Sequence, residues 1–253
     1  PINQREEARR AHQKLCVEKS DHLSLLKAYH KWTQAVSDKK ERVFCNVNYL
    51  SNTAFQQIIL RKKQFVELLA EIGFISIVKW HKNPYREHEL DAQCNQNSHN
   101  LAMVKACLVA GLYPNVALVT EKDNEARVFT PSNGQVSLHP SSFLFQDTLF
   151  ENRYLVYLEK VKTSKLFIRD ATMVTPYSLM LFGGQLTYDK DVRQLTVDKW
   201  IKFRVDKDIA VLMDQLRIKV NMYLERLIER QHKPESEITA EELEEENSLV
   251  LAI

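Results

Sequence analysis

Apolar residues recur every three to four positions in several stretches of the chain, which is the spacing of an amphipathic helix. This pattern covers residues 23–36, 55–72, 101–112 and 209–227 and predicts four such helices, with shorter charged helical stretches at 5–16 and 42–50. Ser20 and Asp21 precede the first of the four, and Ser51 and Asn52 precede the second. Side chains of this kind favour helix starts because they accept hydrogen bonds from the free N–H groups of the first turn.

From Val116 onward the hydrophobic period changes to two. Short runs rich in β-branched and aromatic residues predict strands at 116–120, 127–130, 135–139, 154–161, 166–168, 186–188, 195–197 and 200–204. The sequence Pro-Ser-Asn-Gly at 131–134 is typical of a turn between two of them. Many short strands with turns between them indicate a small barrel, into which residues 176–182 would insert a helical turn. The predicted fold class is therefore α+β, with a helical bundle, a barrel and C-terminal helices.

Residues 75–96 follow neither period and are expected to form an exposed insertion, since they exceed the usual length of a helix connection. His81, His88, Cys94 and His99 lie in or near this segment, but their spacing matches none of the usual zinc patterns. A polar loop is the preferred interpretation over a metal site. The four cysteines of the chain show neither Cys-x-x-Cys pairing nor the density of a disulfide framework and are interpreted as reduced thiols.

The composition is that of an ordinary globular protein, with 253 residues, 44% of them hydrophobic and 27% charged. No apolar run approaches the length of a membrane span, and the first residues lack the hydrophobic core of a signal peptide. We therefore expect no membrane association and an intracellular location, in the cytoplasm, the nucleus or both.

Charge is distributed unevenly although the net charge is only +2. Residues 1–112 carry 17 Lys and Arg against 11 Asp and Glu, whereas residues 206–253 carry 6 against 12. A basic first part and an acidic end indicate different partners for the two. The basic sequence Arg61-Lys-Lys is either a solvated helix face or a contact to an RNA backbone.

The strands predicted at 154–161 and 166–168 flank a turn with lysines and hydroxyls, which predicts a β-hairpin that presents a phosphate-binding tip. The alternative is that these lysines only keep the hairpin soluble. The sequence His-Pro-Ser-Ser, at the end of the strand predicted at 135–139, supplies a second set of donors. If the strands pair in a barrel, we expect this loop and the hairpin tip to form one groove. The candidate nucleic-acid-binding residues are His139, Ser141, Ser142, Lys160, Lys162, Thr163, Ser164 and Lys165.

These motifs, in this order, resemble the C-terminal part of the DEAH-box RNA helicases, nearest to the group of RNA helicase A and the G-quadruplex-resolving helicases. The resemblance covers about residues 20–227. It rests on Ser20-Asp-His-Leu, on residues 65–74, on Ala110-Gly-Leu-Tyr-Pro-Asn-Val, on His139-Pro-Ser-Ser, on Glu159-Lys-Val-Lys-Thr-Ser, on Ile168-Arg-Asp, and on Thr175-Pro-Tyr with Leu181-Phe-Gly-Gly.

The resemblance implies three parts: a helical, ratchet-like segment of the helicase-associated region at 1–112, an oligonucleotide-binding (OB) fold at 113–205, and a helical C-terminal extension at 206–253. It implies that single-stranded or structured RNA binds here, with DNA as an alternative, while upstream motor domains use ATP and magnesium. No cofactor is expected in this chain itself. The residues agree, because a phosphate-binding loop requires two glycines five positions apart and the five glycines offer no such pair.

A second interpretation is a helicase-like platform for protein interactions, without motor activity, in a post-transcriptional regulatory complex. The acidic tail at 235–253 and the exposed insertion motivate it, since the tail is expected either to pack internally or to engage a protein. A stand-alone enzyme is the weakest interpretation, because no nucleophile elbow, metal motif or paired-carboxylate signature is present in the sequence. Any enzyme activity is expected to belong to a parent ATP-dependent RNA helicase.

Overall fold

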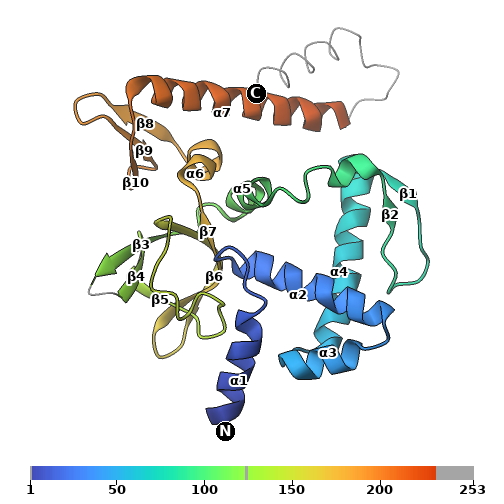
Figure 1. Ribbon diagram of the computed structural model, residues 1–253. Coiled ribbons are helices and arrows are strands. Elements are labelled where there is room, and N and C mark those ends of the chain that lie inside the picture. Colours follow the sequence, from blue (N-terminus) through green and yellow to red (C-terminus); the bar gives the residue numbers. More distant parts are fainter. Residues whose placement is uncertain (1, 123–124, 232–253) are drawn as a thin grey trace. The chain divides into compact units, whose positions relative to one another are not determined.

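The structure, a computed structural model, describes residues 2–122 and 125–231 (Figure 1). Contacts divide the chain into two compact units. The first unit consists of Pro1–Ile58 and Ala102–Leu179, and the second of Ile59–Leu101 and Met180–Ile253. Each unit therefore combines segments that are far apart in the sequence.

The first unit contains α1 (Ile2–Gln13), α2 (Asp21–Ser37), α3 (Glu41–Asn48), the first turns of α4 (Asn52–Glu71) and most of α5 (Leu101–Leu112). Of these helices, α2 and α4 begin at the capping residues predicted from the sequence. The hydroxyl of Ser20 accepts a hydrogen bond from the N–H of Leu23, which caps α2. Inside this group Trp32 of α2 stacks on Phe55 of α4, with 5.1 Å between the ring centroids, and both side chains are buried.

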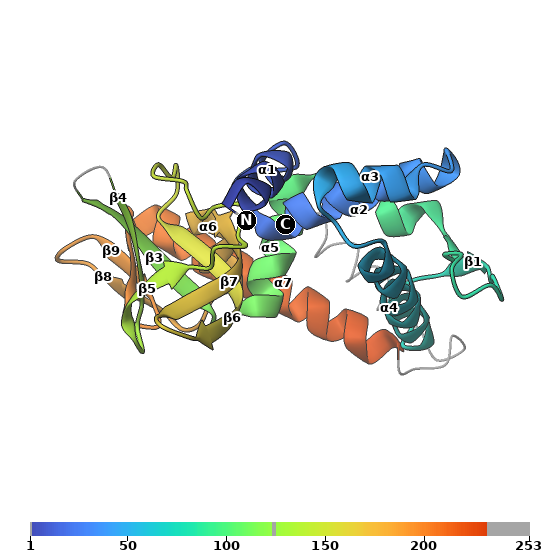
Figure 2. The same cartoon turned by 90° about the horizontal axis from the view of Figure 1, so that it is seen from below.

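Five strands of the first unit close into a barrel with the order β3-β4-β5-β7-β6 (Figures 1 and 2). The strands are β3 (Val116–Lys122), β4 (Glu125–Thr130), β5 (Gly134–Leu138), β6 (Tyr154–Lys162) and β7 (Leu166–Val174). All neighbouring strands pair antiparallel except β5 and β7, which are parallel, with Ser137 opposite Phe167 and Leu138 opposite Ile168. Because every strand has two neighbours, the barrel leaves no open sheet edge.

Alternating apolar side chains fill the barrel, as the period of two predicted. The buried members of this core include Val119, Val128, Val136, Leu138, Leu155, Ile168 and Met173. The start of β6 departs from alternation, because its first four residues are all buried. A strand segment covered on both faces carries a continuous apolar run, and Tyr-Leu-Val-Tyr at 154–157 is such a run.

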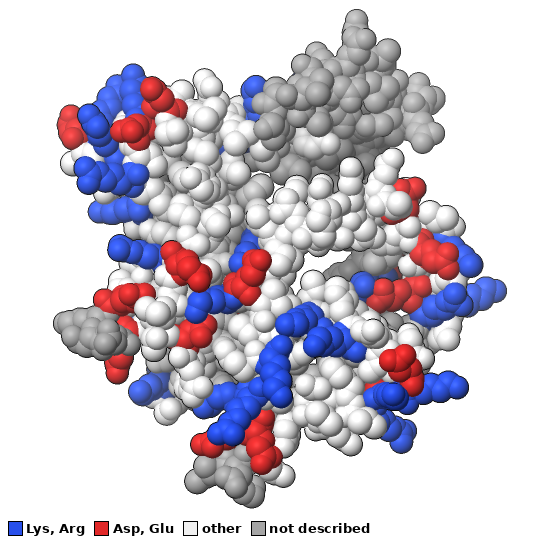
Figure 3. Space-filling view, in the orientation of Figure 1, with Lys and Arg blue, Asp and Glu red and all other residues white. Residues whose placement is uncertain are grey.

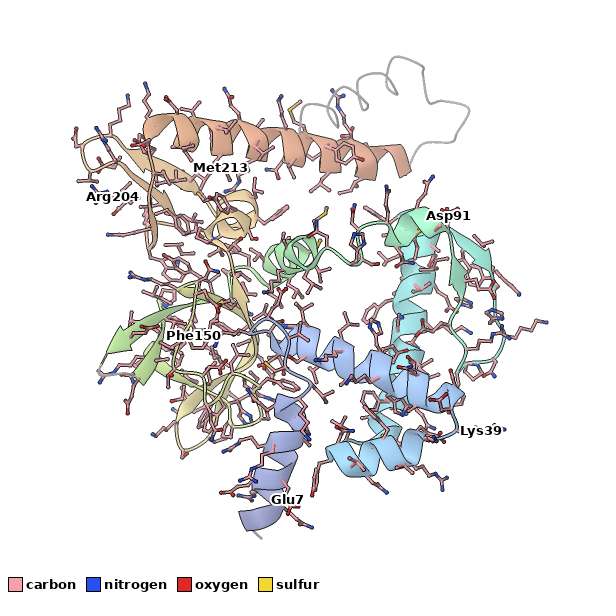
Figure 4. All side chains as sticks on the ribbon, in the orientation of Figure 1. Glu7, Lys39, Asp91, Phe150, Arg204 and Met213 are labelled. Carbon is pink, nitrogen blue, oxygen red and sulfur yellow. The ribbon has the colours of Figure 1, made fainter. Side chains whose placement is uncertain are left out.

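In the second unit, the segment predicted as an exposed insertion contains β1 (Ile77–Lys79), β2 (Glu89–Leu90) and the short 3-10 helix η1 (Ala92–Asn95). The two strands pair antiparallel, and the carboxylate of Asp91, labelled in Figure 4, accepts a hydrogen bond from the N–H of Gln93 at the start of η1. Most side chains of the segment are exposed, as expected, but His88 is buried.

The rest of the second unit contains the end of α6 (Pro176–Phe182), a three-stranded sheet and α7 (Lys207–Gln231). The sheet consists of β8 (Leu186–Asp189), β9 (Gln194–Val197) and β10 (Ile201–Arg204). The guanidinium of Arg217 on α7 donates hydrogen bonds to the backbone carbonyls of Gly183 and Gly184 at 2.5 and 2.6 Å. A Cβ atom at Gly184 would collide with the carboxylate of Asp198, so any other residue there would require the Asp198 side chain to move.

The predicted α+β fold class, with helices and a barrel, is confirmed. Of the eight predicted strands, five form the barrel, whereas the three at 186–204 form their own sheet, so α6 follows the last barrel strand rather than interrupting the barrel. The division at 112 and 205 stays a prediction, and the acidic tail at 235–253 lies outside the described residues. No helix in the described part of the chain has the length and hydrophobicity needed to cross a membrane.

Candidate nucleic-acid interface

The His-Pro-Ser-Ser sequence forms a turn directly after β5, which we call the His139 turn (residues 139–142). The parallel pairing of β5 with β7 fixes where the turn begins, because the backbone N–H of His139 donates to the carbonyl of Ile168 at 3.0 Å. The imidazole of His139 contacts the ring of Phe167 edge to face, with 5.6 Å between the centroids. The turn therefore starts at a defined position on the barrel surface.

Hydrogen bonds inside the His139 turn orient the imidazole. The backbone N–H of Ser141 donates to Nδ1 of His139 at 3.2 Å, and the hydroxyl of Ser141 lies 2.7 Å from the same nitrogen. A nitrogen that accepts from an N–H carries no proton, so the proton of the neutral ring is on Nε2. The ring is partly exposed, and it presents an N–H donor while Ser141 presents an exposed hydroxyl.

The hydroxyl of Ser142 points away from this surface and into the protein. It donates to Oδ2 of Asp21, the first residue of α2, at 2.7 Å. Its oxygen also accepts from the N–H of Leu144 at 3.1 Å. The structure thus uses Ser142 to hold the turn in place.

A hollow of about 460 Å³ opens between the His139 turn and α1. Helix α1 contributes Arg5, Arg9 and His12, and the other wall is formed by the turn and by Phe143 and Phe145. The guanidinium of Arg9 lies over the ring of Phe145, with 5.3 Å to the centroid. Figures 1 and 2 both place α1 beside the barrel, and in Figure 3 Lys and Arg side chains gather around α1 with a few acidic side chains among them. The hollow combines cationic donors with aromatic faces.

The second candidate element is the end of the β6–β7 hairpin, which we call the lysine tip (residues 162–165). The N–H of Thr163 donates to the carbonyl of Lys165 at 2.9 Å, which closes the turn. The four side chains of the tip are all exposed. Lys160, just before the tip, donates instead to the hydroxyl of Ser132 and the side-chain carbonyl of Asn133, both at 2.7 Å, and so ties the hairpin to the β4–β5 turn.

The structure does not bring the lysine tip and the His139 turn into one hollow. The tip precedes Leu166 at the start of β7, whereas the turn follows Leu138, which is opposite Ile168. Because β5 and β7 run parallel, the two elements lie at opposite ends of their paired stretch, separated by roughly 13 Å at about 3.3 Å per residue along the strand. A ligand that contacts both would have to run along β7.

Asp21 is a residue of this region whose role the sequence did not indicate beyond helix capping. Burial raises the pKa of Asp21 to about 6, against the effect of its hydrogen bonds from Ser142, Ala171 and Phe143, and the nearby carboxylate of Asp170 adds to the increase. Burial also lowers the pKa of His22, whose Nδ1 lies 2.7 Å from the hydroxyl of Thr172. In the sequence, Asp21 was marked by its position at the start of a helix and by its place in the Ser20-Asp-His-Leu motif.

Two of the three basic side chains at 61–63 on α4 have partners within the second unit. Lys62 forms an ion pair with Glu87 at 2.7 Å, and Lys63 donates to the backbone carbonyls of His81 and Asn83. In the same segment, Nε2 of His88 pairs with Glu67 at 2.8 Å. Within residues 2–122 and 125–231, no group of three or more His, Cys, Asp and Glu side chains is arranged to hold a metal ion.

Two family models match the chain. Residues 104–186 match the oligonucleotide/oligosaccharide-binding (OB) fold, which includes all five barrel strands and α6. Residues 193–253 match the C-terminal domain in RNA helicases, which begins close to β9.

Three curated relatives align with most of the chain. The DExH-box ATP-dependent RNA helicase DExH1 of Arabidopsis thaliana is 35% identical over 95% of the chain and 23% of its own length. The human ATP-dependent DNA/RNA helicase DHX36 is 35% identical over 85% of the chain and 21% of its own length. The human ATP-dependent RNA helicase DHX29 is 31% identical over 90% of the chain and 17% of its own length. The chain thus spans about a fifth of the length of the relatives it matches, and it corresponds to the part of DExH-box RNA helicases that contains the OB fold and the C-terminal domain in RNA helicases.

Proposed function

We propose that this region binds single-stranded RNA for an ATP-dependent helicase whose motor domains lie elsewhere in the parent protein. The observation that carries the proposal is the hollow between α1 and the His139 turn, which places two guanidinium groups, an imidazole N–H donor and a hydroxyl beside two phenylalanine rings. Cations and short donors suit phosphates and ribose, and aromatic faces suit unstacked bases. The relatives are named as ATP-dependent helicases, which supports the assignment of the motor to the parent.

The RNA strand would follow β7 from the His139 turn to the lysine tip. At one end His139 offers an N–H donor and Ser141 an acceptor oxygen, because the Ser141 hydroxyl proton is donated to Nδ1 of His139, and at the other end the ammonium groups of Lys162 and Lys165 flank the hydroxyls of Thr163 and Ser164. Ser142 and Lys160 serve the same surface indirectly, because their polar atoms are bonded to Asp21 and to the β4–β5 turn. Binding of this kind tolerates many sequences, because backbone contacts carry little sequence information.

Replacing Lys162 and Lys165 with Ala tests the path. Affinity for a single-stranded RNA, measured by fluorescence anisotropy at several salt concentrations, should fall for every sequence. Each lost phosphate contact should reduce the magnitude of the log–log salt slope by about 0.7, so the double variant should lose about 1.4.

The control is the double replacement of Lys190 and Lys207, two exposed lysines of the second unit, with Ala. This variant removes the same charge and should keep the wild-type slope. Equal slopes for all three proteins would contradict the path along β7 and favour the alternative that the lysines only solubilise the hairpin.

A platform for protein interactions without motor activity is the second candidate. Exposed apolar side chains on one face of α4 favour it: Phe65 is 64% exposed, Leu68 55% and Ile72 50%. The ATPase motifs of the parent protein discriminate between the candidates, because a platform without a motor would lack a phosphate-binding loop.

A further inference from the structure

Asp21 is buried at the point where α2, the His139 turn and β7 meet. Its side chain is 1% exposed although it carries an ionisable carboxyl group. A buried carboxylate is costly unless it is hydrogen-bonded, so its partners are expected to be fixed in number and direction.

Three donors from two distant segments converge on this carboxylate. Oδ1 accepts from the backbone N–H of Phe143 at 2.8 Å. Oδ2 accepts from the hydroxyl of Ser142 at 2.7 Å and from the backbone N–H of Ala171 at 2.8 Å. Hydrogen bonds to an ionised acceptor are stronger than bonds between neutral groups. One side chain on α2 therefore holds both the end of the His139 turn and a point on β7.

The backbone of β7 is shaped for this contact. Asp170, the residue before Ala171, has a φ of 53°, which is left-handed and unusual for a residue other than glycine. It also falls in a gap of the β6–β7 register, between the pairs of Arg169 with Glu159 and of Ala171 with Tyr157. The irregularity directs the N–H of Ala171 to the carboxylate.

The neighbours of Asp21 attach α2 to β7 but not to the turn. The hydroxyl of Ser20 and the imidazole of His22 both lie 2.7 Å from the hydroxyl of Thr172. The N–H of Met173 donates to the carbonyl of Lys19 at 2.9 Å. With α2 anchored on the strand in this way, the carboxylate of Asp21 is what extends the anchor to the turn.

We propose that Asp21 is a positioning residue, which holds the His139 turn in its RNA-binding arrangement and couples it to helix α2. The part of this inference that concerns RNA binding rests on the proposed function. A shift of α2 relative to β7 would pull on Ser142 and Phe143, and RNA bound at His139 and Ser141 would in turn hold α2 in place, because coupling between two sites is reciprocal.

The test compares Asp21→Asn, Ser142→Ala and the double variant with the wild-type chain. Asn keeps the shape of Asp but has one acceptor oxygen, so it can retain the two donors at the Oδ2 position while its amide group opposes the N–H of Phe143. Amide hydrogen exchange measured by NMR should show faster exchange at Phe143 in both single variants. RNA affinity should fall roughly 3- to 10-fold, the cost of ordering one or two side chains on binding, and the double variant should lose no more than either single one.

The matched control is Ser24→Ala. Ser24 is also a buried residue in the first turn of α2, but its hydroxyl bonds only to the backbone of Val17 and Ser20. This variant should lose stability yet keep the RNA affinity of the wild type, which separates positioning from a general weakening of the helix.

Two results would overturn the inference. Unchanged exchange at Phe143 in a folded Asp21→Asn protein would show that the carboxylate does not hold the turn. Faster exchange with unchanged RNA affinity would show that holding the turn does not serve binding. If the wild-type chain binds no RNA at all, the proposed function fails, and the exchange experiment still decides whether Asp21 fixes the turn.

Discussion

The raised pKa of Asp21 predicts a specific dependence of stability on pH, which Asp21→Asn should remove. The pKa of this carboxyl is about 6 in the folded chain against its ordinary value of 3.8. At about 1.36 kcal/mol per pH unit, this difference corresponds to about 3 kcal/mol of folding free energy. The side chain is almost fully buried, so solvent screening reduces this value little.

The sign follows from which state holds the proton. Between about pH 4 and pH 6 the folded chain keeps Asp21 protonated while the unfolded chain has released the proton, so raising the pH favours unfolding. The free energy of unfolding should therefore fall by up to about 3 kcal/mol across this window and stay level, as far as Asp21 is concerned, on either side. Other carboxyl groups titrate in the same range, so only the difference between wild type and variant isolates Asp21.

Urea unfolding of the wild type and of Asp21→Asn, from about pH 4 to about pH 7, measures that difference. The variant has no ionisable group at position 21, so its curve is offset from that of the wild type but is not tilted by this residue. The wild type should lose stability relative to the variant as the pH rises. Two curves that stay parallel would refute the reasoning, and a wild type that gains relative stability with pH would show that the hydrogen bonds outweigh burial.

Four further outcomes are expected. Thr163→Val should weaken RNA binding by about 1 kcal/mol, or roughly 5-fold, without changing the salt slope, because it removes one net hydrogen bond and no charge; anisotropy titrations at several salt concentrations check both values. Leu155→Ala should lower the free energy of unfolding by about 2–5 kcal/mol in urea, because Leu155 is fully buried in the barrel. Removing residues 235–253 should leave RNA affinity unchanged or slightly higher, because acidic charge is lost, and a marked loss in a folded deletion variant would speak against it. The chain with added RNA should show no ATP turnover above a mock preparation.

Local features of the sequence were sufficient for most elements. The caps at Ser20 and Ser51 work as predicted, because a capping side chain and its N–H partner are three residues apart. The period of two located the barrel strands for a similar reason, since alternation is a property of each strand alone. The confirmed family resemblance added the OB fold, which the period could not distinguish from other small barrels.

These local patterns do not predict which distant segments pair with one another. The strands at 186–204 have the same period as the barrel strands, but nothing in the period shows that they pair only with one another. The end of β7 was missed because Arg169 and Asp170 interrupt its apolar run, although the strand continues to Val174. Apolar spacing in α4 was correct, yet burial reaches only its first part, where Phe55 and Ile59 lie.

The candidate site shows the same limit. The sequence located the His139 turn and the lysine tip, but their separation depends on the parallel pairing of β5 with β7. It did not reveal the hollow beside the turn, because α1 has no clear apolar face of its own to predict a neighbour. Nor did it reveal the role of Asp21, whose partners Ser142 and Ala171 lie 121 and 150 positions away.

Because these partners lie far apart in the sequence, they are synthesised at different times. Ser20 is translated 152 residues before Thr172, the strand residue that its hydroxyl contacts. At a ribosomal rate of about 5–20 residues per second, Thr172 is synthesised roughly 8–30 s after the start of α2. During this interval the carboxylate of Asp21 lacks its partners, and the helix can pack only against segments translated close to it, such as α4 through Trp32 and Phe55. The nascent helical segment is therefore complete in sequence long before it is complete in structure, and a ribosome that pauses before Thr172 would prolong its exposure to chaperones and proteases.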